Sequence, residues 1–134
     1  LSKRLSLILK NKIKNKKISF LGVTFKANTD DMRDSSSLKL IPYLSKKGAK
    51  IKYYDPTGSK KEFEKLKNVE FSKTIRESIN NSDVVILHTD WNDFKSINFK
   101  KFSKNKNLII YDMRNIFSPS KIKKLGLRYF GIGR

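Results

Sequence analysis

Short apolar segments rich in β-branched and aromatic residues recur along the chain, and amphipathic stretches separate them. The clearest are residues 18–23, 50–54, 83–88 and 108–111, and a shorter one lies at 69–71. Such runs, bounded by polar residues and glycine, are typical of β-strands. Several of them are almost continuously apolar, which indicates strands that are covered on both faces of a sheet.

The segments between these strands have the apolar spacing of helices. Residues 35–48 place apolar side chains on one helical face. Ser35 or Ser36 can cap the start of this helix, whereas Pro42 predicts a kink or a later start. Shorter helices are expected at 60–66 and 74–80. Because strands alternate with helices, we expect an α/β fold, a Rossmann-like three-layer sandwich with a mostly parallel sheet in a single domain.

The amino-terminal segment, residues 1–14, is interpreted as the end of a connecting helix from upstream domains, with the domain itself at 15–134. Leu5, Leu9 and Ile13 share one face at helical spacing, which supports this interpretation. The alternative is a frayed, lysine-rich tail.

The chain is strongly basic, with 31 Lys and Arg residues against 12 Asp and Glu and a formal net charge of +19. Such a charge attracts polyanions, so a nucleic-acid-binding module is a candidate function. Lysine and asparagine crowd every apparent loop and helix face, however, which favours lysine as the default surface residue of this protein. We therefore expect no specific nucleic-acid partner.

Several kinds of chemistry are disfavoured by composition. There is no cysteine, which excludes disulfides, thiolate metal sites and a cysteine nucleophile in this chain. His88 is the single histidine, so neither a metal site nor a Ser-His-Asp triad is expected. No apolar run approaches the roughly 20 residues that span a bilayer, and no signal-peptide cleavage site is evident. We expect a cytoplasmic protein without membrane contact.

The candidate site lies in the loops after the strands, because ligands of open parallel sheets bind beyond the carboxyl ends of the strands. The loop at 24–34 is long, and its Lys26 and Arg33 could meet phosphate or sugar hydroxyls. A solvated loop whose aspartates cap and pair internally is the alternative. At 112–115, Arg114 is a candidate bidentate phosphate ligand, and an ion pair with Asp112 is the alternative.

The remaining loop features indicate structure more than chemistry. Trp91 and Phe94 follow the strand at 83–88 and are interpreted as hydrophobic anchors of their loop. His88 is expected to be packed and hydrogen-bonded. The first strand carries Gly22 but no G-x-G-x-x-G, so this domain is not expected to cradle a dinucleotide pyrophosphate.

Five stretches of sequence carry a family resemblance: FLGVTFKANTDDMRDSSSLKLI, KGAKIKYYDP, SDVVILHTDWNDF, IIYDMRNIF and GLRYFGIGR. Together they resemble the carboxy-terminal, UDP-binding domain of the UDP-glucose/GDP-mannose dehydrogenase family. The resemblance covers about residues 16–134, and the G-x-x-F-K-x-N-T-D-D-M-R stretch is its most specific part. Within the family, the chain is most similar to bacterial UDP-glucose dehydrogenases. Ala27 stands where the family commonly has proline, which should loosen the loop only slightly.

The resemblance implies NAD-dependent oxidation of a nucleotide sugar, UDP-glucose to UDP-glucuronate, in two steps. By the family pattern, Phe25, Lys26 and Arg114 bind the UDP-sugar and Arg33 reaches toward NAD. The catalytic cysteine and the glycine-rich NAD loop belong to parts of the family that precede residue 1, so no catalytic residue is expected in this chain. NAD would be bound mainly by an amino-terminal domain, and the full-length protein is expected to be a homodimer. A non-catalytic UDP-sugar-binding remnant is an alternative.

Overall fold

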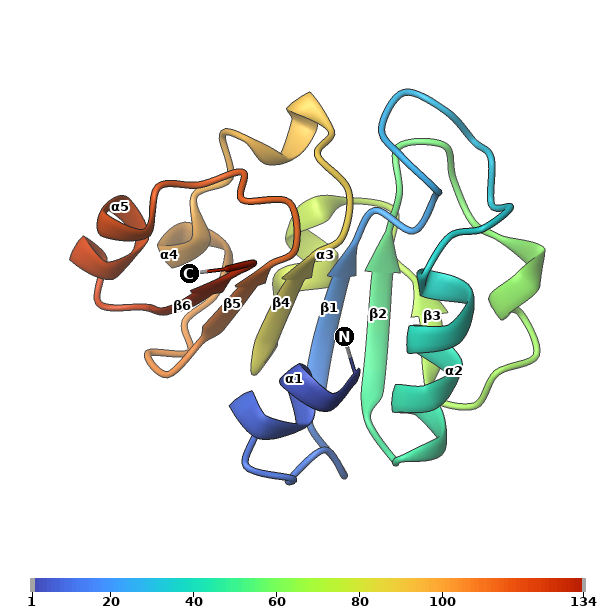
Figure 1. Ribbon diagram of the computed structural model, residues 1–134, viewed down its shortest axis with the longest axis horizontal. Helices are drawn as coiled ribbons and strands as arrows, with labels where there is room; N and C mark the ends of the chain where they lie inside the picture. The colour runs from blue at the N-terminus through green and yellow to red at the C-terminus, as the bar shows by residue number, and fades with distance from the viewer. Residues whose placement is uncertain (1, 134) are drawn as a thin grey trace.

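The computed structural model describes residues 2–133, which form a parallel sheet covered on both faces (Figure 1). Within these residues the sheet has six strands in the order β3-β2-β1-β4-β5-β6, and each strand is parallel to its neighbours. The expected Rossmann-like α/β fold is therefore confirmed, with a fully parallel sheet in place of a mostly parallel one. The strands are β1 Lys17–Leu21, β2 Lys50–Tyr54, β3 Val69–Phe71, β4 Val84–Leu87, β5 Ile109–Asp112 and β6 Arg128–Gly131.

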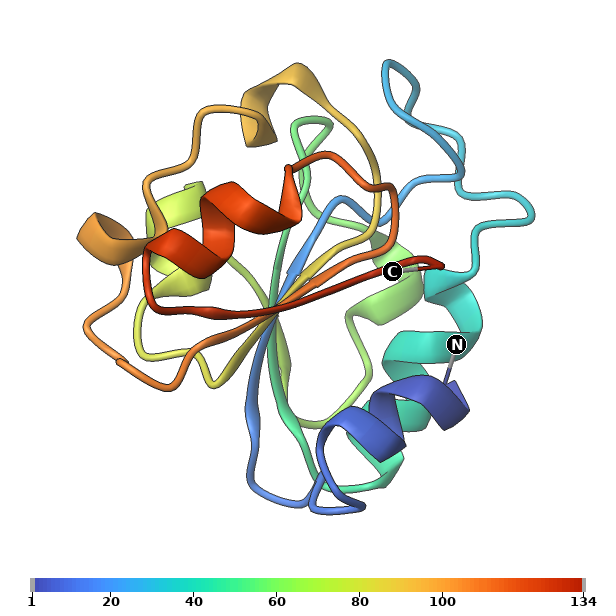
Figure 2. The same cartoon turned by 60° about the vertical axis from the view of Figure 1, so that its left-hand side comes forward.

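Two layers of helices enclose the sheet, as Figure 2 shows. One face carries the α-helices α1 Ser2–Ile8 and α2 Ser37–Lys46 and the short 3₁₀ helix η1 Lys61–Phe63. The other carries α3 Ile75–Ile79, the 3₁₀ helix η2 Asn92–Phe94, α4 Phe99–Phe102 and α5 Pro119–Lys124. Alternate residues of each strand supply the two cores: Phe20 packs beneath α2, whereas Leu21 faces the opposite layer. None of the helices within residues 2–133 is long and apolar enough to cross a membrane.

Several element boundaries differ from the sequence expectations for local reasons. Strand β1 ends at Leu21 because Gly22 adopts a φ of +80°, which takes the backbone out of the sheet. Helix α2 runs through Pro42, and Ser36 lies at its amino-terminal cap position without a capping side-chain hydrogen bond. Helix α1 ends at Ile8, and Lys10 and Asn11 then take positive φ values that cannot continue a helix.

The sequence pattern does not predict α4, α5 and β6, which are only four to six residues long and so too short to show a period. The helix expected at 74–80, by contrast, is present as α3. The Thr74 side chain caps its start by accepting from the Glu77 amide at 3.0 Å. In α1 and the turn that follows it, the buried side chains of Leu5, Leu9 and Ile13 share one cluster with Phe20, so this segment packs on the sheet.

Candidate functional site

The carboxyl ends of the three central strands meet at one edge of the sheet. In the strand register Leu21 lies beside Leu87, and Leu87 lies beside Asp112. The loops that follow β1, β4 and β5 therefore start side by side. The chain continues from β1 to β2 on one side of β1, whereas β4 pairs with the other side of β1. The strand order therefore reverses between β1 and β4, and open α/β sheets bind ligands at the carboxyl edge of such a topological switch point.

Gly22 allows the first two of these loops to approach each other closely. A Cβ at this position would lie 1.7 Å from the Thr89 hydroxyl oxygen and 3.2 Å from the Phe94 ring, in addition to the positive φ. The glycine is thus required twice, for its backbone conformation and for its lack of a side chain.

The loop after β1 is anchored by groups from its neighbours. The buried Asp55 carboxylate, just after β2, accepts from the Val23 amide at 2.8 Å, and Ser35 and Ser37 both donate to the Val23 carbonyl. Further out, the Phe25 amide donates to the Asp31 carbonyl at 2.8 Å and closes the loop on itself. This long loop is therefore held at its base.

Arg114 joins all three loops. Its Nε donates to the His88 carbonyl at 2.9 Å, and one Nη donates to the Phe25 carbonyl at 3.4 Å. Asp112 accepts from the Arg114 backbone amide, so the ion pair considered from the sequence is replaced by a backbone contact. The guanidinium is exposed and keeps further N–H donors for an anion at this edge.

Asp112 fixes the course of the chain around Arg114. Its carboxylate is fully buried and also accepts from the Phe117 amide at 2.9 Å and from the Tyr129 hydroxyl at 2.8 Å. A buried carboxylate with several donors is strongly held in place. Tyr129 comes from β6, so the last strand of the sheet helps to position the Arg114 loop.

His88 is a buried structural residue of this edge, as expected. Its Nε2 is 2.8 Å from the Ser36 hydroxyl, at the start of α2. Burial lowers the pKa of His88 from 6.5 to about 4, and the positive charge of Arg114 contributes. The imidazole is thus neutral near pH 7, where it joins α2 to the end of β4.

This burial predicts an acid-sensitive stability. The folded pKa lies below that of the unfolded chain, so the stabilisation is complete above about pH 6.5 and is lost as the pH falls toward 4. Between about pH 7 and 5 we expect a loss of roughly 2 kcal/mol in unfolding free energy, measured by urea denaturation. His88→Gln removes the only histidine and should flatten this slope. An equal slope in both proteins would contradict the assignment.

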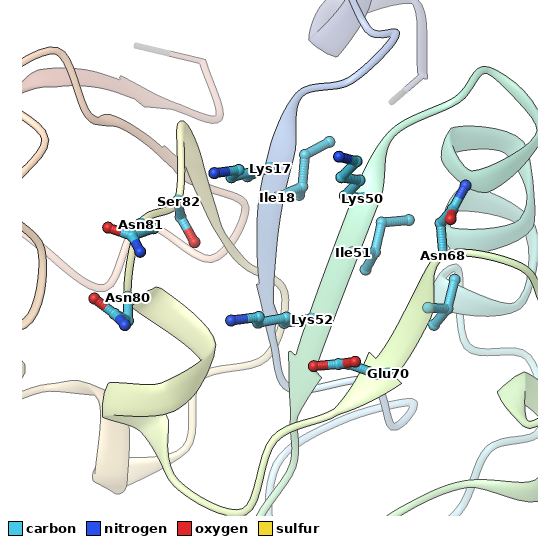
Figure 3. Close-up of a pocket in the computed structure, with 11 residues that line it drawn as sticks. Lys17, Ile18, Lys50, Ile51, Lys52, Asn68, Glu70, Asn80, Asn81 and Ser82 are labelled. Carbon is cyan, nitrogen blue, oxygen red and sulfur yellow. The ribbon is translucent and has the colours of Figure 1, made fainter.

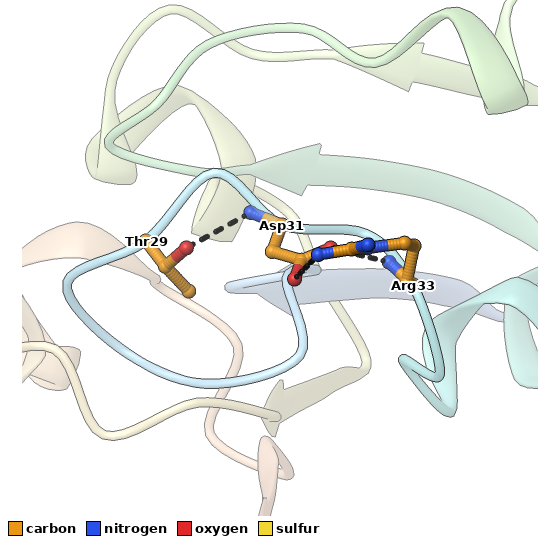
Figure 4. A network of polar contacts seen from close by, with 3 residues as sticks. All are labelled: Thr29, Asp31 and Arg33. Carbon is orange, nitrogen blue, oxygen red and sulfur yellow. Dashed lines mark hydrogen bonds and ion pairs between the residues drawn. The ribbon is translucent and has the colours of Figure 1, made fainter.

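Arg33 is exposed and paired within its own loop (Figure 4). Its Nε and one Nη lie 3.1 Å from the two carboxylate oxygens of Asp31, and the Asp31 amide is held by the Thr29 hydroxyl. Hydrogen bonding with Arg33 lowers the pKa of Asp31. The internal pairing that the sequence left open is therefore present, and the guanidinium can be released because exposed pairs are weak.

Comparison with known proteins bears directly on this edge. Residues 19–119 match the UDP binding domain of the UDP-glucose/GDP-mannose dehydrogenase family, which is most of the chain. The match contains all three loops. The chain belongs to this family.

Relatives and solved structures agree with this assignment to the family's UDP binding domain. The chain is 35% identical over 123 residues to UDP-glucose 6-dehydrogenase of Rhizobium meliloti, covering 91% of the chain and 28% of that protein. It is 33% identical to the enzyme of the same name from Rickettsia prowazekii, covering 97% of the chain and 31% of the relative. The chain thus spans less than a third of these relatives.

Among solved structures, NDP-N-acetyl-D-galactosaminuronic acid dehydrogenase from Methanosarcina mazei Go1 superposes with a TM-score of 0.81 at 27% identity. The match covers 98% of this chain and 27% of that structure. A UDP-glucose dehydrogenase from Pyrobaculum islandicum gives a TM-score of 0.76 at 21% identity, covering 98% of this chain and 28% of that structure, and it shares the fold.

Within this UDP binding domain, the structure brings some of the residues predicted from sequence together and leaves Arg33 apart from them. Arg114 contacts the backbone of Phe25, a residue that is 45% exposed, and Lys26 follows on the same exposed loop. Arg33 lies further along the loop and points to Asp31. Their roles in binding stay predictions. No group of His, Cys, Asp or Glu suited to a metal ion occurs among the residues that the structure describes.

The supporting residues Gly22, Asp55 and Asp112 were not recognised as such from the sequence. A strand-ending aspartate followed by a loop was the available signal for both carboxylates. Trp91 and Phe94 are buried, as their interpretation as loop anchors requires.

Proposed function

We propose that this chain is the carboxy-terminal, UDP-sugar-binding domain of a longer NAD-dependent UDP-glucose 6-dehydrogenase that forms UDP-glucuronate in two steps. The observation that carries the proposal is Arg114, which bridges the ends of β1, β4 and β5 inside the region matched to the UDP binding domain. In this proposal residues 1–14 contain the end of a connecting helix, residues 15–134 bind the nucleotide sugar, and the full-length protein is a cytoplasmic homodimer.

The residues of this edge suit a diphosphate with an attached sugar. Arg114 and Lys26 supply positive charge, and a guanidinium matches two phosphate oxygens at once. The exposed Phe25 ring offers an apolar surface beside them. Because Arg114 is already fixed by two carbonyls, little side-chain freedom would be lost on binding.

In this proposal NAD is bound by another domain and lies next to this one. The chain lacks the glycine-rich turn, and α2 begins at Ser37, far along the chain from the end of β1 at Leu21, so no helix start follows that strand directly to hold a pyrophosphate. Arg33 is the residue that would reach an NAD bound by another domain, after leaving Asp31. NAD would accept the hydride there, whereas the residues of this chain bind and orient the sugar nucleotide.

The proposal is tested by titrating UDP into the chain and following backbone amide shifts near 150 mM salt, where non-specific attraction is screened. We expect saturable shifts centred on Phe25, Lys26 and Arg114. Arg114→Ala should weaken UDP about thirtyfold, because charge-assisted contacts to phosphate are lost. Lys26→Ala should have a smaller effect.

Arg128→Ala is the matched control, because it removes the same charge from the amino end of β6, at the opposite edge of the sheet. Equal weakening by Arg114→Ala and Arg128→Ala would contradict a site at the carboxyl edge. So would shifts spread evenly over the lysine-rich surface, or tighter binding of an RNA oligonucleotide than of UDP. GDP-mannose serves as the comparison for base and sugar preference.

A further inference from the structure

A cationic pocket, separate from the candidate UDP-sugar site, lies at the amino ends of the strands, on the face that carries α3 (Figure 3). Its volume is about 400 Å³. Helix α3 is short and covers the sheet only beyond this region, so the side chains at the start of β1 and β2 are left open. The polar groups around it are Lys17, Lys50, Lys52, Asn68, Glu70, Asn80, Asn81 and Ser82.

Three lysines crowd one patch of this sheet face. Lys17 and Lys50 are direct register partners on β1 and β2, and Lys52 lies two residues further along β2 on the same face. Like charges placed directly opposite on neighbouring strands destabilise a sheet. The arrangement therefore holds positive charge together at a cost in stability, which a bound anion would offset.

The nearby carboxylates leave this charge largely uncompensated. Glu70 lies opposite Lys52 in the register of β2 and β3, yet within residues 2–133 none of the three ammonium groups forms a salt bridge. Asp83 is not among the residues that line the pocket, and its carboxylate accepts from two neutral groups, the Lys17 backbone amide at 2.9 Å and the Asn105 side-chain amide at 3.5 Å. The pocket lining thus carries three cations against one anion.

Neutral donors complete the lining. Figure 3 shows Lys17 and Lys52 extending from adjacent strands toward the segment of Asn80, Asn81 and Ser82, which connects α3 to β4. Asparagine amides donate to phosphate oxygens as readily as to other acceptors. Among the described residues, 2–133, no aromatic side chain lines the pocket, so none of them would stack on a base there.

We propose that this pocket binds a compact phosphate-bearing anion of the size of pyrophosphate, at the edge of the sheet opposite the candidate UDP-sugar site. Lys17, Lys50 and Lys52 would neutralise the phosphate groups, and Asn80 and Asn81 would donate to their oxygens. This inference does not depend on the proposed dehydrogenase function, because the two sites share no residue.

The test is a titration of pyrophosphate, with inorganic phosphate alongside, into the chain near 150 mM salt. We expect saturable amide shifts at Asn80, Asn81 and Ser82. The triple variant Lys17→Gln, Lys50→Gln, Lys52→Gln should bind about tenfold more weakly, since each exposed pair contributes modestly. The control Lys121→Gln, Lys123→Gln, Lys124→Gln removes the same charge from α5 and should bind like the wild type.

Four outcomes would overturn the proposal. Three of them are equal binding by both triple variants, shifts that do not saturate, and tighter binding of single-stranded RNA at the same residues. The fourth is a set of shifts at Arg114 alone, which would mean that pyrophosphate only occupies the candidate UDP site. The triple variant of the pocket should have a melting temperature no lower than that of the wild type, because repulsion between Lys17 and Lys50 is relieved. If the triple variant does not fold, the single variant Lys52→Gln replaces it in the titration.

Discussion

Replacing Gly22 with alanine should lower the free energy of unfolding by about 4 kcal/mol, the largest effect expected in this domain. The added Cβ would lie 1.7 Å from the Thr89 hydroxyl oxygen, and the residue would have to hold a φ of +80°. Since the loops after β1 and β4 cannot both keep their places, UDP affinity should fall as well. Urea denaturation followed by circular dichroism measures the first effect.

Gly58→Ala is the control that separates the two causes. Gly58 has a φ of +95°, but an added Cβ would have no atom within 4 Å, so only the backbone strain of about 1 kcal/mol applies. If both variants lose the same stability, close packing against Thr89 is not what requires Gly22. Thr89→Ala should recover part of the loss in the Gly22→Ala background, as a double-mutant cycle would show.

Asp112→Ala should cost about 3 kcal/mol of stability and most of the UDP affinity. The carboxylate is fully buried and accepts from the amides of Arg114 and Phe117 and from the Tyr129 hydroxyl. Without it the loop that carries Arg114 loses its fixed course. The stability is measured by thermal and urea unfolding, and the affinity by calorimetric UDP titration.

Asp90→Ala is the matched control, because Asp90 is exposed on the neighbouring loop. Its removal should change stability by less than about 0.5 kcal/mol. Asp112→Asn keeps the shape of the side chain and one acceptor oxygen, so its loss of stability should lie between those of Asp90→Ala and Asp112→Ala. A small effect of Asp112→Ala, comparable with Asp90→Ala, would show that β6 and the Arg114 loop are held by other contacts.

Much of the fold was predictable because the buried strands have a strong and simple pattern. The runs in β1, β4 and β5 are almost entirely buried and mostly apolar, and a parallel sheet follows from the helices between them. Strand β6 was not predictable in this way: its burial alternates and an arginine begins it. Helix α2 also shows that tertiary packing of Leu40, Ile41 and Leu44 overrides the local effect of Pro42.

The loops that form the candidate site were predictable from the sequence, but the contacts between their side chains and backbones were not. The position of Lys26, Arg33 and Arg114 after strands was enough to place them at one edge. That Arg114 contacts the His88 and Phe25 carbonyls depends on contacts between residues far apart in sequence, which no local pattern contains. The same holds for the amino-edge pocket, whose lysines come together only through the register of β1 and β2.

The position of β1 at the centre of the sheet has a consequence for how the domain is made. During synthesis β1 emerges before the other strands of this sheet and can pair with β2 on one side, but its other side waits for β4. About 60 residues separate β1 from β4, a delay of roughly 3–12 s at ordinary translation rates. Throughout that interval the nascent chain exposes an unpaired apolar strand edge, so chaperone contact should be concentrated there until β4 leaves the ribosome.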